Sequence, residues 1–225
     1  MGTAFSTILT RFAMQEIDDI NWTREIAANP ARFFRAKSDT LIMAIPRFSR
    51  PPEMQKWLSF TPPDYDDFLY TAEEEQEGPI TVETGKDGYE LCCAVMAGTE
   101  QTVPCTYDTE TGDVTLQTDL EAGQSVDIDF YTDGVFDNEL DVEQCHILGL
   151  CVAYQWFSRF SNTWLNMTPK IKDKSFDIGS ESAQMTATTA KRKVTKADLD
   201  DALLRYEQNK AYLKNMPTGS QFVPP

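Results

Sequence analysis

Positive charge is missing from a long central part of this 225-residue chain. From Asp87 to Ser158 the sequence has fifteen Asp and Glu residues and no Lys or Arg. Over the whole chain, 20 basic and 36 acidic residues give a formal net charge of −16, which argues against direct attraction to phosphate backbones or anionic membranes. An acidic surface is still compatible with DNA that must slide past without sticking.

Histidine and suitably spaced cysteines, the usual components of metal and nucleophilic sites, are scarce. The one histidine, His146, has no second His with which to form a zinc site, and packing is its favoured interpretation. The five cysteines form no CxxC motif, and we interpret them as small buried hydrophobic residues in a reducing compartment. No Gly-rich phosphate loop or G-x-S-x-G motif occurs. The sequence therefore predicts no enzyme, no cofactor and no metal ion.

Long apolar runs are also absent. No stretch of about 18 uninterrupted apolar residues is present to span a bilayer. The first residues lack the basic start and apolar run of a secretory signal. A composition of 41% hydrophobic and 25% charged residues is that of a folded soluble protein. We expect a soluble protein made in the cytosol.

Apolar residues recur at helical spacing before the acidic region. They predict one helix over Thr3–Asp19 and a second that begins at Asn29-Pro30 and ends at Pro46. From Ser49 to Tyr70 the chain has four prolines and five aromatic residues. This composition predicts an irregular segment packed across a surface.

The acidic region has the pattern of short strands separated by Gly-containing turns. Val126, Ile128 and Phe130 alternate with Asp127, Asp129 and Tyr131, which indicates one face in a core and one in water. We expect a small antiparallel sandwich or barrel. Its five predicted strands are Ile80–Glu83, Tyr89–Met96, Thr102–Tyr107, Asp113–Gln117 and Ser125–Tyr131.

A capping-box pattern, Asp141 followed by Gln144, opens the most apolar helix, which we expect over Val142–Leu165. A helix that is apolar on almost every side is buried in its own domain or against neighbouring subunits.

Met167–Ala190 is polar and is expected to be extended. A second pattern similar to a capping box, at Thr195, predicts the start of a last helix that ends at about Asn215.

The fold class predicted from these elements is α+β. A helical core of about four helices carries an inserted β-sandwich or barrel of about five antiparallel strands and an extended C-terminal tail. The boundaries are 1–78 for the first helices and the aromatic, proline-rich bridge, 79–136 for the β insertion, 137–216 for the remaining helices, and 217–225 for the tail.

Each of three charged clusters can be explained by ordinary structure or by a binding function. Asp108–Asp113 faintly resembles a calcium loop but fits a hairpin turn better. Asp127, Asp129 and Asp133 could gather a cation, although a solvated strand face is favoured. The basic run Lys191–Lys193 could contact nucleic acid or an acidic partner, or it could simply be solvated without any partner. A sugar- or calcium-binding β module on a helical stalk is therefore an alternative function.

The order of these elements resembles head-to-tail adaptor (connector, or neck) proteins of tailed bacteriophages. Short motifs spread over most of the chain carry the resemblance: Ala44–Phe48 with Pro51-Pro52, Thr84–Leu91, Tyr107–Gly112, Phe130–Phe136, Ile147–Tyr154 and Asn166–Phe176.

The resemblance implies a structural virion protein without enzymatic activity, one subunit of a homo-oligomeric ring, typically twelvefold. The ring would dock on the portal protein of a filled capsid, in the neck of the virion, and would meet a downstream neck or tail protein. Double-stranded DNA would pass through its channel without specific binding, and no membrane would be involved. Other ring proteins of the neck, a stopper or a tail terminator, are alternatives within the same class.

Two sets of apolar residues are the candidate contacts of such a ring. Apolar side chains in the last helix and the polar tail predict a portal contact: Tyr206, Tyr212, Leu213, Met216, Phe222 and Val223. Aromatic residues of the apolar helix and the following segment are candidates for the interface between subunits: Phe157, Phe160, Trp164 and Phe176.

Overall fold

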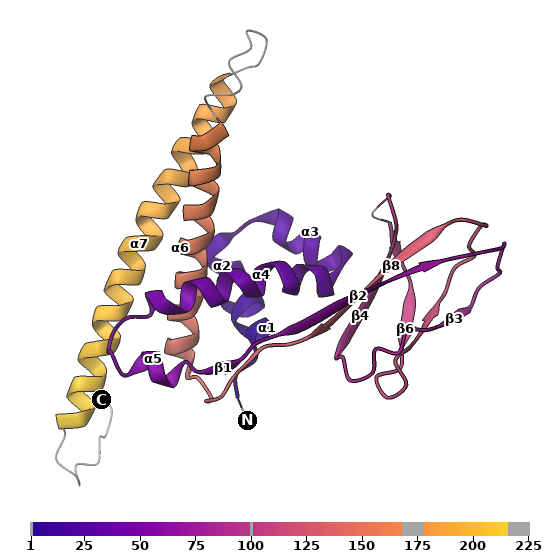
Figure 1. Ribbon diagram of the computed structural model, residues 1–225. Coiled ribbons are helices and arrows are strands. Elements are labelled where there is room, and N and C mark those ends of the chain that lie inside the picture. Colours follow the sequence, from indigo (N-terminus) through magenta and orange to yellow (C-terminus); the bar gives the residue numbers. More distant parts are fainter. Residues whose placement is uncertain (1, 100, 168–177, 216–225) are drawn as a thin grey trace, which may run out of the picture.

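The computed structural model describes residues 2–99, 101–167 and 178–215, with side chains up to Arg159 and again from Thr186 to Ala211. The chain has a mixed α+β fold with antiparallel sheets, as the sequence predicts. Figure 1 shows a helical body with a β module extending to one side and a long pair of helices standing across the other end. We call residues 64–132 the β module.

The chain begins with a broken helical segment. An α-helical turn, a π-helix and a second α-helical turn follow each other without a gap, which confirms the helix predicted over Thr3–Asp19: α1 (Phe5–Thr7), η1 (Ile8–Ala13) and α2 (Met14–Ile17). Asp18 has a positive φ of 46° and ends the segment. The Asp19 carboxylate then accepts from the Asn21 backbone N–H at 2.9 Å and caps α3 (Ile20–Ala28), which the sequence analysis missed.

Helix α4 (Pro30–Ala44) begins and ends where the sequence predicts. The Asn29 side chain accepts from the Arg32 backbone N–H at 2.9 Å, and Pro30 occupies the first turn. A short 3-10 turn, η2 (Ile45–Arg47), contains Pro46. Helix α4 contacts both α6 and the strands β4 and β8, so it lies between the helical body and the β module.

The proline-rich bridge is more regular than predicted. It contains α5 (Met54–Trp57), β1 (Phe60–Thr61) and β2 (Asp64–Thr71). Strand β2 pairs along its whole length with β8, from Asp64 opposite Thr132 to Thr71 opposite Ser125. The prediction of an irregular segment up to Tyr70 is therefore wrong, and the sheet begins at Asp64, not at Pro79. The strand forms because of a partner about sixty residues later, which no local pattern reveals.

All five predicted strands are present in the β module, and the third is split by Pro104. Its strands are β3 (Ile80–Glu83), β4 (Leu91–Met96), β5 (Thr102–Val103), β6 (Cys105–Tyr107), β7 (Asp113–Leu116) and β8 (Ser125–Thr132). They form two antiparallel sheets, in the orders β2-β8-β4-β5 and β3-β7-β6. Side chains of both sheets share one apolar core, as in a sandwich. A further strand, β9 (Val135–Phe136), pairs with β1 beside the helices.

Strand β8 departs from its predicted alternation. Val126, Ile128 and Phe130 face the sandwich core as expected, but Asp129 and Tyr131 are only 5% and 2% exposed. The prediction that these two side chains face water is wrong because α4 covers this end of the strand. Phe34 of α4 stacks on the Tyr131 ring with centroids 5.5 Å apart.

Two long helices complete the body: α6 (Val142–Met167) and α7 (Ile178–Asn215). The capping box at the start of α6 is confirmed, because the Asp141 carboxylate accepts from the Gln144 N–H and the Gln144 side chain accepts from the Asp141 N–H, both at 2.8 Å. Helix α7 begins at Ile178, so the predictions of an extended segment to Ala190 and of a helix start at Thr195 are wrong. Thr195 is buried within the helix, and its hydroxyl donates to the Lys191 carbonyl.

The apolar face of α6 is buried within the subunit itself. From Ile147 to Ala153 every residue of this helix is buried against the N-terminal helical segment, α4 or α7. The described part of α6 therefore needs no neighbouring subunit to explain its apolar character. Within the described ranges, we find no helix long and apolar enough to cross a bilayer.

Candidate interaction surfaces

A buried polar seam joins the β module to the helical body. The Asn29 amide donates to the Asp129 carboxylate at 2.8 Å, and the Arg32 guanidinium lies 3.3 Å from the same carboxylate. The Ser38 hydroxyl and the Tyr131 hydroxyl are hydrogen-bonded at 3.1 Å, and burial raises the pKa of Tyr131. Directional bonds of this kind set the orientation of the module on α4. The Asp129 carboxylate and the Tyr131 hydroxyl therefore have a structural role at this boundary rather than a place in a cation site.

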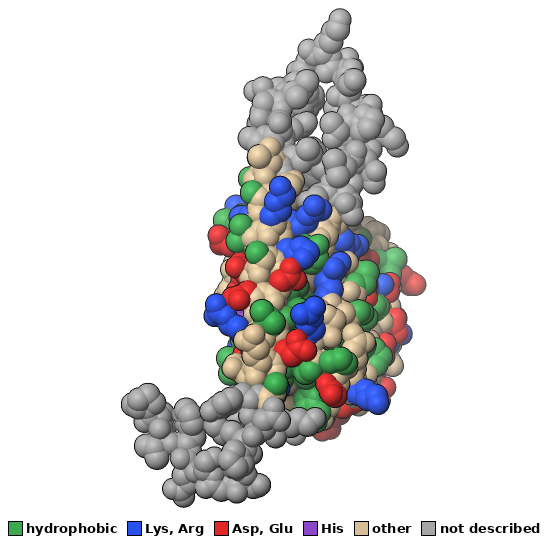
Figure 2. Space-filling model, turned by 90° about the vertical axis from the view of Figure 1, so that its left-hand side faces the viewer, with side chains coloured by type: hydrophobic (Ala, Val, Ile, Leu, Met, Phe, Trp, Pro, Cys, Tyr) green, Lys and Arg blue, Asp and Glu red, His purple; other side chains and the backbone are tan. Residues whose placement is uncertain are grey.

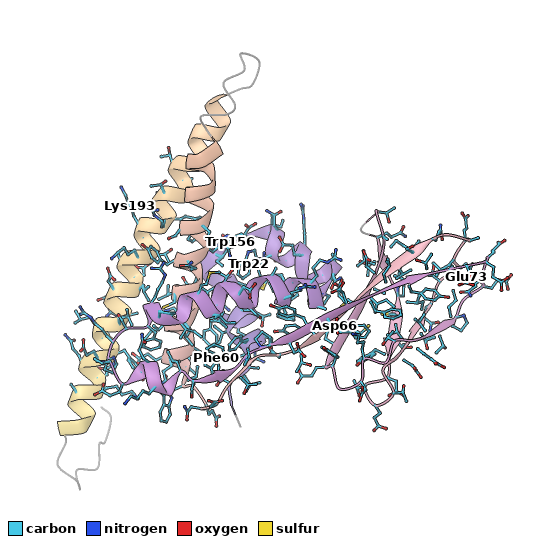
Figure 3. The ribbon with its side chains drawn as sticks, viewed as in Figure 1. Trp22, Phe60, Asp66, Glu73, Trp156 and Lys193 are labelled. Atoms are coloured by element: carbon cyan, nitrogen blue, oxygen red, sulfur yellow. The ribbon has the colours of Figure 1, made fainter. Side chains whose placement is uncertain are left out.

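A buried lysine of α4 contacts side chains of α3 and α6. Lys37 is 6% exposed, and its ammonium lies 2.7 Å from the Glu25 carboxylate. The same ammonium is 5.2 Å from the Trp22 ring centroid and 4.6 Å from that of Trp156. The two labelled tryptophans in Figure 3 come from α3 and α6, so one cation joins three helices. This cluster has a packing role, and the Lys37 charge is paired with that of Glu25.

The charged side chains of the β module are almost all acidic. Residues 64–132 contain 18 acidic residues and one basic residue, a net charge of −17, whereas the remaining residues have 18 acidic and 19 basic residues, a net charge of +1. The one basic residue, Lys86, donates to the Asp66 carboxylate and lowers its pKa. Glu73, Glu74, Glu75 and Glu77 are exposed after β2, and Figure 3 places Glu73 at the end of the module farthest from the long helices.

The outer face of α7 carries basic side chains. Lys191, Lys193 and Lys196 are exposed, together with Val194, and Figure 2 shows Lys and Arg side chains on this face of the molecule, with Asp and Glu side chains between them. Lys196 is paired with Asp200 at 2.6 Å, one turn along the helix. Lys193 lies on the opposite side of the molecule from Glu73 (Figure 3).

A groove opens between the proline-rich bridge and α7. Its volume is about 590 Å³, and its apolar lining comes from Pro51, Pro52, Met54 and Trp57 on one side and Tyr206 and Ala211 on the other. Its floor is fixed, because the Gln144 amide donates to the Tyr206 hydroxyl at 2.7 Å and Met54 Sδ lies 3.5 Å from that hydroxyl. We call this cavity the α5–α7 groove.

The histidine lies in a polar depression rather than in the core. His146 Nδ1 is 3.7 Å from the Glu16 carboxylate, and the His146 side chain is 49% exposed, so the prediction that it is a packing residue is wrong. A cavity of about 410 Å³ beside it is lined by carboxylates of α6 and α7, including Asp198 and Asp201. No cluster of three or more metal-ligating side chains occurs among the described residues.

All five cysteines are free, and they differ in environment. Cys145 and Cys151 are buried in α6, and burial raises their pKa values to about 11 and about 12. Cys92, Cys93 and Cys105 of the module are only half-buried, which corrects the prediction that all five are buried. The Cys92 thiol donates to the Cys105 sulfur, which lowers the pKa of Cys105 to about 7 and raises that of Cys92.

Two aromatic residues and the Asp-rich turn considered for the ligand-binding alternative have structural contacts within the module. Tyr89 and Tyr107 contact the buried Phe130 ring at centroid distances of 5.7 and 5.5 Å, so they belong to the edge of the core. The Asp108 carboxylate accepts from the Glu110 backbone N–H at 2.9 Å, as in an ordinary Asx turn. The hairpin-turn interpretation of Asp108–Asp113 is confirmed.

The structure places only two of the predicted contact side chains, and both are buried. Tyr206 has no exposed surface and packs against Phe48, and Phe157 is 6% exposed. Neither is a surface contact of the subunit as described, which corrects those two predictions. Tyr212, Leu213, Phe160 and Trp164 lie in α7 and α6, with side chains outside the described set. Met216, Phe222, Val223 and Phe176 lie outside the described residues.

The α5–α7 groove was not predicted from the sequence. Its two walls are about 150 residues apart in sequence, and only the packing of α7 across α5 brings them together. The one available signal was Trp57 among four prolines, which does indicate a packed surface but not its partner.

Comparison with known proteins gives no relative. No family of known proteins, no curated protein and no solved structure matches this chain.

Proposed function

We propose that this chain is a structural virion protein, one subunit of a head-to-tail adaptor ring that docks on the portal and extends the DNA channel toward the tail. The proposal rests on the resemblance of the sequence motifs and on one feature of the molecule. That feature is the separation of charge between an acidic β module at one end and the basic run Lys191–Lys193 of α7 at the other.

Opposite charge on opposite ends favours head-to-tail association of identical subunits. The exposed carboxylates around Glu73 are distant from Lys193, so they cannot neutralise each other within one chain. A neighbouring copy can pair the two surfaces, and such a heterologous contact closes into a ring when the rotation between subunits allows it. A DNA passage is compatible with the same chemistry, because anionic walls repel the phosphate backbone.

The portal contact is assigned to the end of α7 and the residues that follow it. Tyr206 is removed from this contact by its burial. The remaining candidates are Tyr212, Leu213, Met216, Phe222 and Val223. Deleting residues 217–225 should abolish portal docking while the subunit stays folded, and unchanged docking would contradict this assignment.

The first test is the mass of the purified protein in solution, alone and mixed with a portal ring from the same source. Ring formation, alone or only on the portal, is expected, and it should weaken as salt screens the charges. The double variant Lys191→Glu/Lys193→Glu should weaken assembly, whereas Arg11→Glu, a charge reversal at an exposed residue outside α7, is the control. A monomer that ignores the portal would overturn the proposal.

A further inference from the structure

The α5–α7 groove has an unusual wall. Trp57 is 47% exposed, although its backbone is held in place by α5 and by the Asn138 amide, which donates to the Trp57 carbonyl at 2.7 Å. Below it, Met54 and Tyr206 are 6% and 0% exposed and form a rigid floor. A large aromatic ring fixed beside a preformed apolar groove is typical of a surface that binds a short apolar segment.

The rim of the groove disfavours a strongly charged occupant. Glu53, Glu207 and Lys210 lie around the apolar lining, so charges of both signs are present. Lys210 is also within 3.8 Å of Asp141 and 5.2 Å of the Tyr206 ring centroid. An uncharged segment with a few apolar side chains therefore fits the groove better than an acidic or basic peptide.

Such a segment follows α7 directly in the sequence. Residues 216–225 have no charged side chain and contain three prolines, with Phe222 and Val223 side by side. Proline-containing peptides bind to aromatic-lined grooves at a low entropic cost, since their extended conformation is preformed. The composition of this segment matches the lining of the groove.

The geometry brings this segment within reach. Helix α7 ends at Asn215, one turn beyond Ala211 in the groove wall, so the chain must turn back by only about 6 Å. The seven residue-to-residue steps from Asn215 to Phe222 can span about 23 Å when extended. Pro217 disfavours continuation of the helix and Gly219 permits a reversal. A tether this short gives a local concentration of the order of millimolar, which favours the groove of the same chain over that of a second copy.

We propose that the α5–α7 groove binds the Phe222-Val223 pair of its own chain, with one or both side chains against Trp57. The inference does not depend on ring assembly. Within the proposed function, the groove would hold these side chains in the free subunit until a portal competes for them.

The test uses the full chain and the exposure of Trp57. Acrylamide quenching of this residue is obtained as the difference between each protein and its Trp57→Phe counterpart. Quenching should rise about twofold in Phe222→Ala/Val223→Ala, because the half-exposed ring loses its cover. The control Thr218→Ala/Ser220→Ala should leave it unchanged. A synthetic peptide of residues 216–225 should restore protection in the Phe222→Ala/Val223→Ala variant and leave the unsubstituted chain unaffected.

A photo-crosslinking amino acid at position 222 provides a second measurement that does not require a tryptophan substitution. Adducts within Pro51–Trp57 or Tyr206–Ala211 at the mass of one chain are expected. Equal quenching of the unsubstituted chain and the Phe222→Ala/Val223→Ala variant, or adducts outside the groove, would overturn the inference. Adducts only at the mass of two chains would assign the groove to a second copy and would overturn it as well. None of these outcomes bears on portal docking, which is tested by mass with the portal ring.

Discussion

The β module holds 18 acidic residues and one lysine, whereas the rest of the chain holds 18 acidic and 19 basic residues. Each region has its own apolar core, one between the two sheets and one among α1–α7 and their connections. The four tryptophans all lie outside the module. The module therefore contributes charge and surface to the molecule, and the helical body contributes the larger core and the apolar groove.

The two regions meet through both packing and polar contacts. Helix α4 packs on β4 and β8, and Asp129 and Tyr131 make hydrogen bonds across the boundary. Apolar packing gives affinity without direction, while buried hydrogen bonds require one orientation. We infer that the charge of the module is presented in a fixed direction relative to α7.

The largest expected difference between the regions is in thiol reactivity. The pKa of Cys105 in the module is lowered to about 7, whereas those of Cys145 and Cys151 in α6 are raised to about 11 and about 12. At pH 7 iodoacetamide should modify Cys105 at least about a hundredfold faster than Cys145 or Cys151, since only the thiolate reacts. The rate of Cys105 modification should rise with pH and level off above a pH of about 7. Peptide mass spectrometry over time measures this order.

The variant Cys105→Ser is the control for that order. It should remove the fast modification without changing the slow sites in α6. Modification of Cys145 at the rate of Cys105 would contradict the contrast between the two regions.

Core truncation tests whether the regions unfold together. Leu148 in α6 and Ile128 in β8 are both fully buried, and replacing either with Ala should lower the free energy of unfolding by about 3 kcal/mol. Because the seam couples the regions, Ile128→Ala should shift the urea midpoint of tryptophan fluorescence, which reports only the helical body. Far-UV circular dichroism should give the same midpoint.

The control for core truncation is Leu204→Ala on the outer face of α7, where the side chain is 43% exposed. It should change stability by less than about 0.5 kcal/mol. A fluorescence midpoint that Ile128→Ala leaves unmoved would mean that the regions unfold independently.

The seam itself is expected to contribute less than either core. Asp129→Ala leaves the Asn29 amide and the Arg32 guanidinium without their acceptor and should cost about 1–3 kcal/mol. Asp127→Ala on the same strand is the matched control, because this half-exposed carboxylate makes neither contact. Urea denaturation measures both, and equal losses would show that the polar seam adds nothing to packing.

The smallest effect is expected from the ion pair within the module. Lys86 lowers the pKa of Asp66 through a hydrogen bond, but the Asp66 side chain is 39% exposed, so the pair contributes well under 1 kcal/mol. Since the folded-state pKa is lowered, this contribution is present above the ordinary value of 3.8 and is lost as pH falls below it. Lys86→Gln should therefore destabilise slightly at pH 7 and have no effect near pH 2. Destabilisation that persists at pH 2 would assign the effect to packing of the lysine stem.

Local sequence signals were sufficient where a residue acts through its neighbours in the chain. The caps at Asn29 and Asp141 and the turns that end each strand of the module depend on side chains within a few residues, and each is present in the structure. Local signals failed at Thr195, where a capping pattern lies inside a longer helix. There α7 packs along α6, and burial of its apolar side favours continuing the helix over capping it.

The sequence by itself determined the α+β class, the five strands of the module, the two caps and the separation of charge. These follow from periodicity, turn chemistry and composition, which are local properties. Only the tertiary structure decided that β2 joins the sheet, that Asp129, Tyr131 and Tyr206 are buried, and that Trp57 borders a groove beside the end of α7. Each of these depends on contacts between residues far apart in the chain, where burial and pairing outweigh local preference.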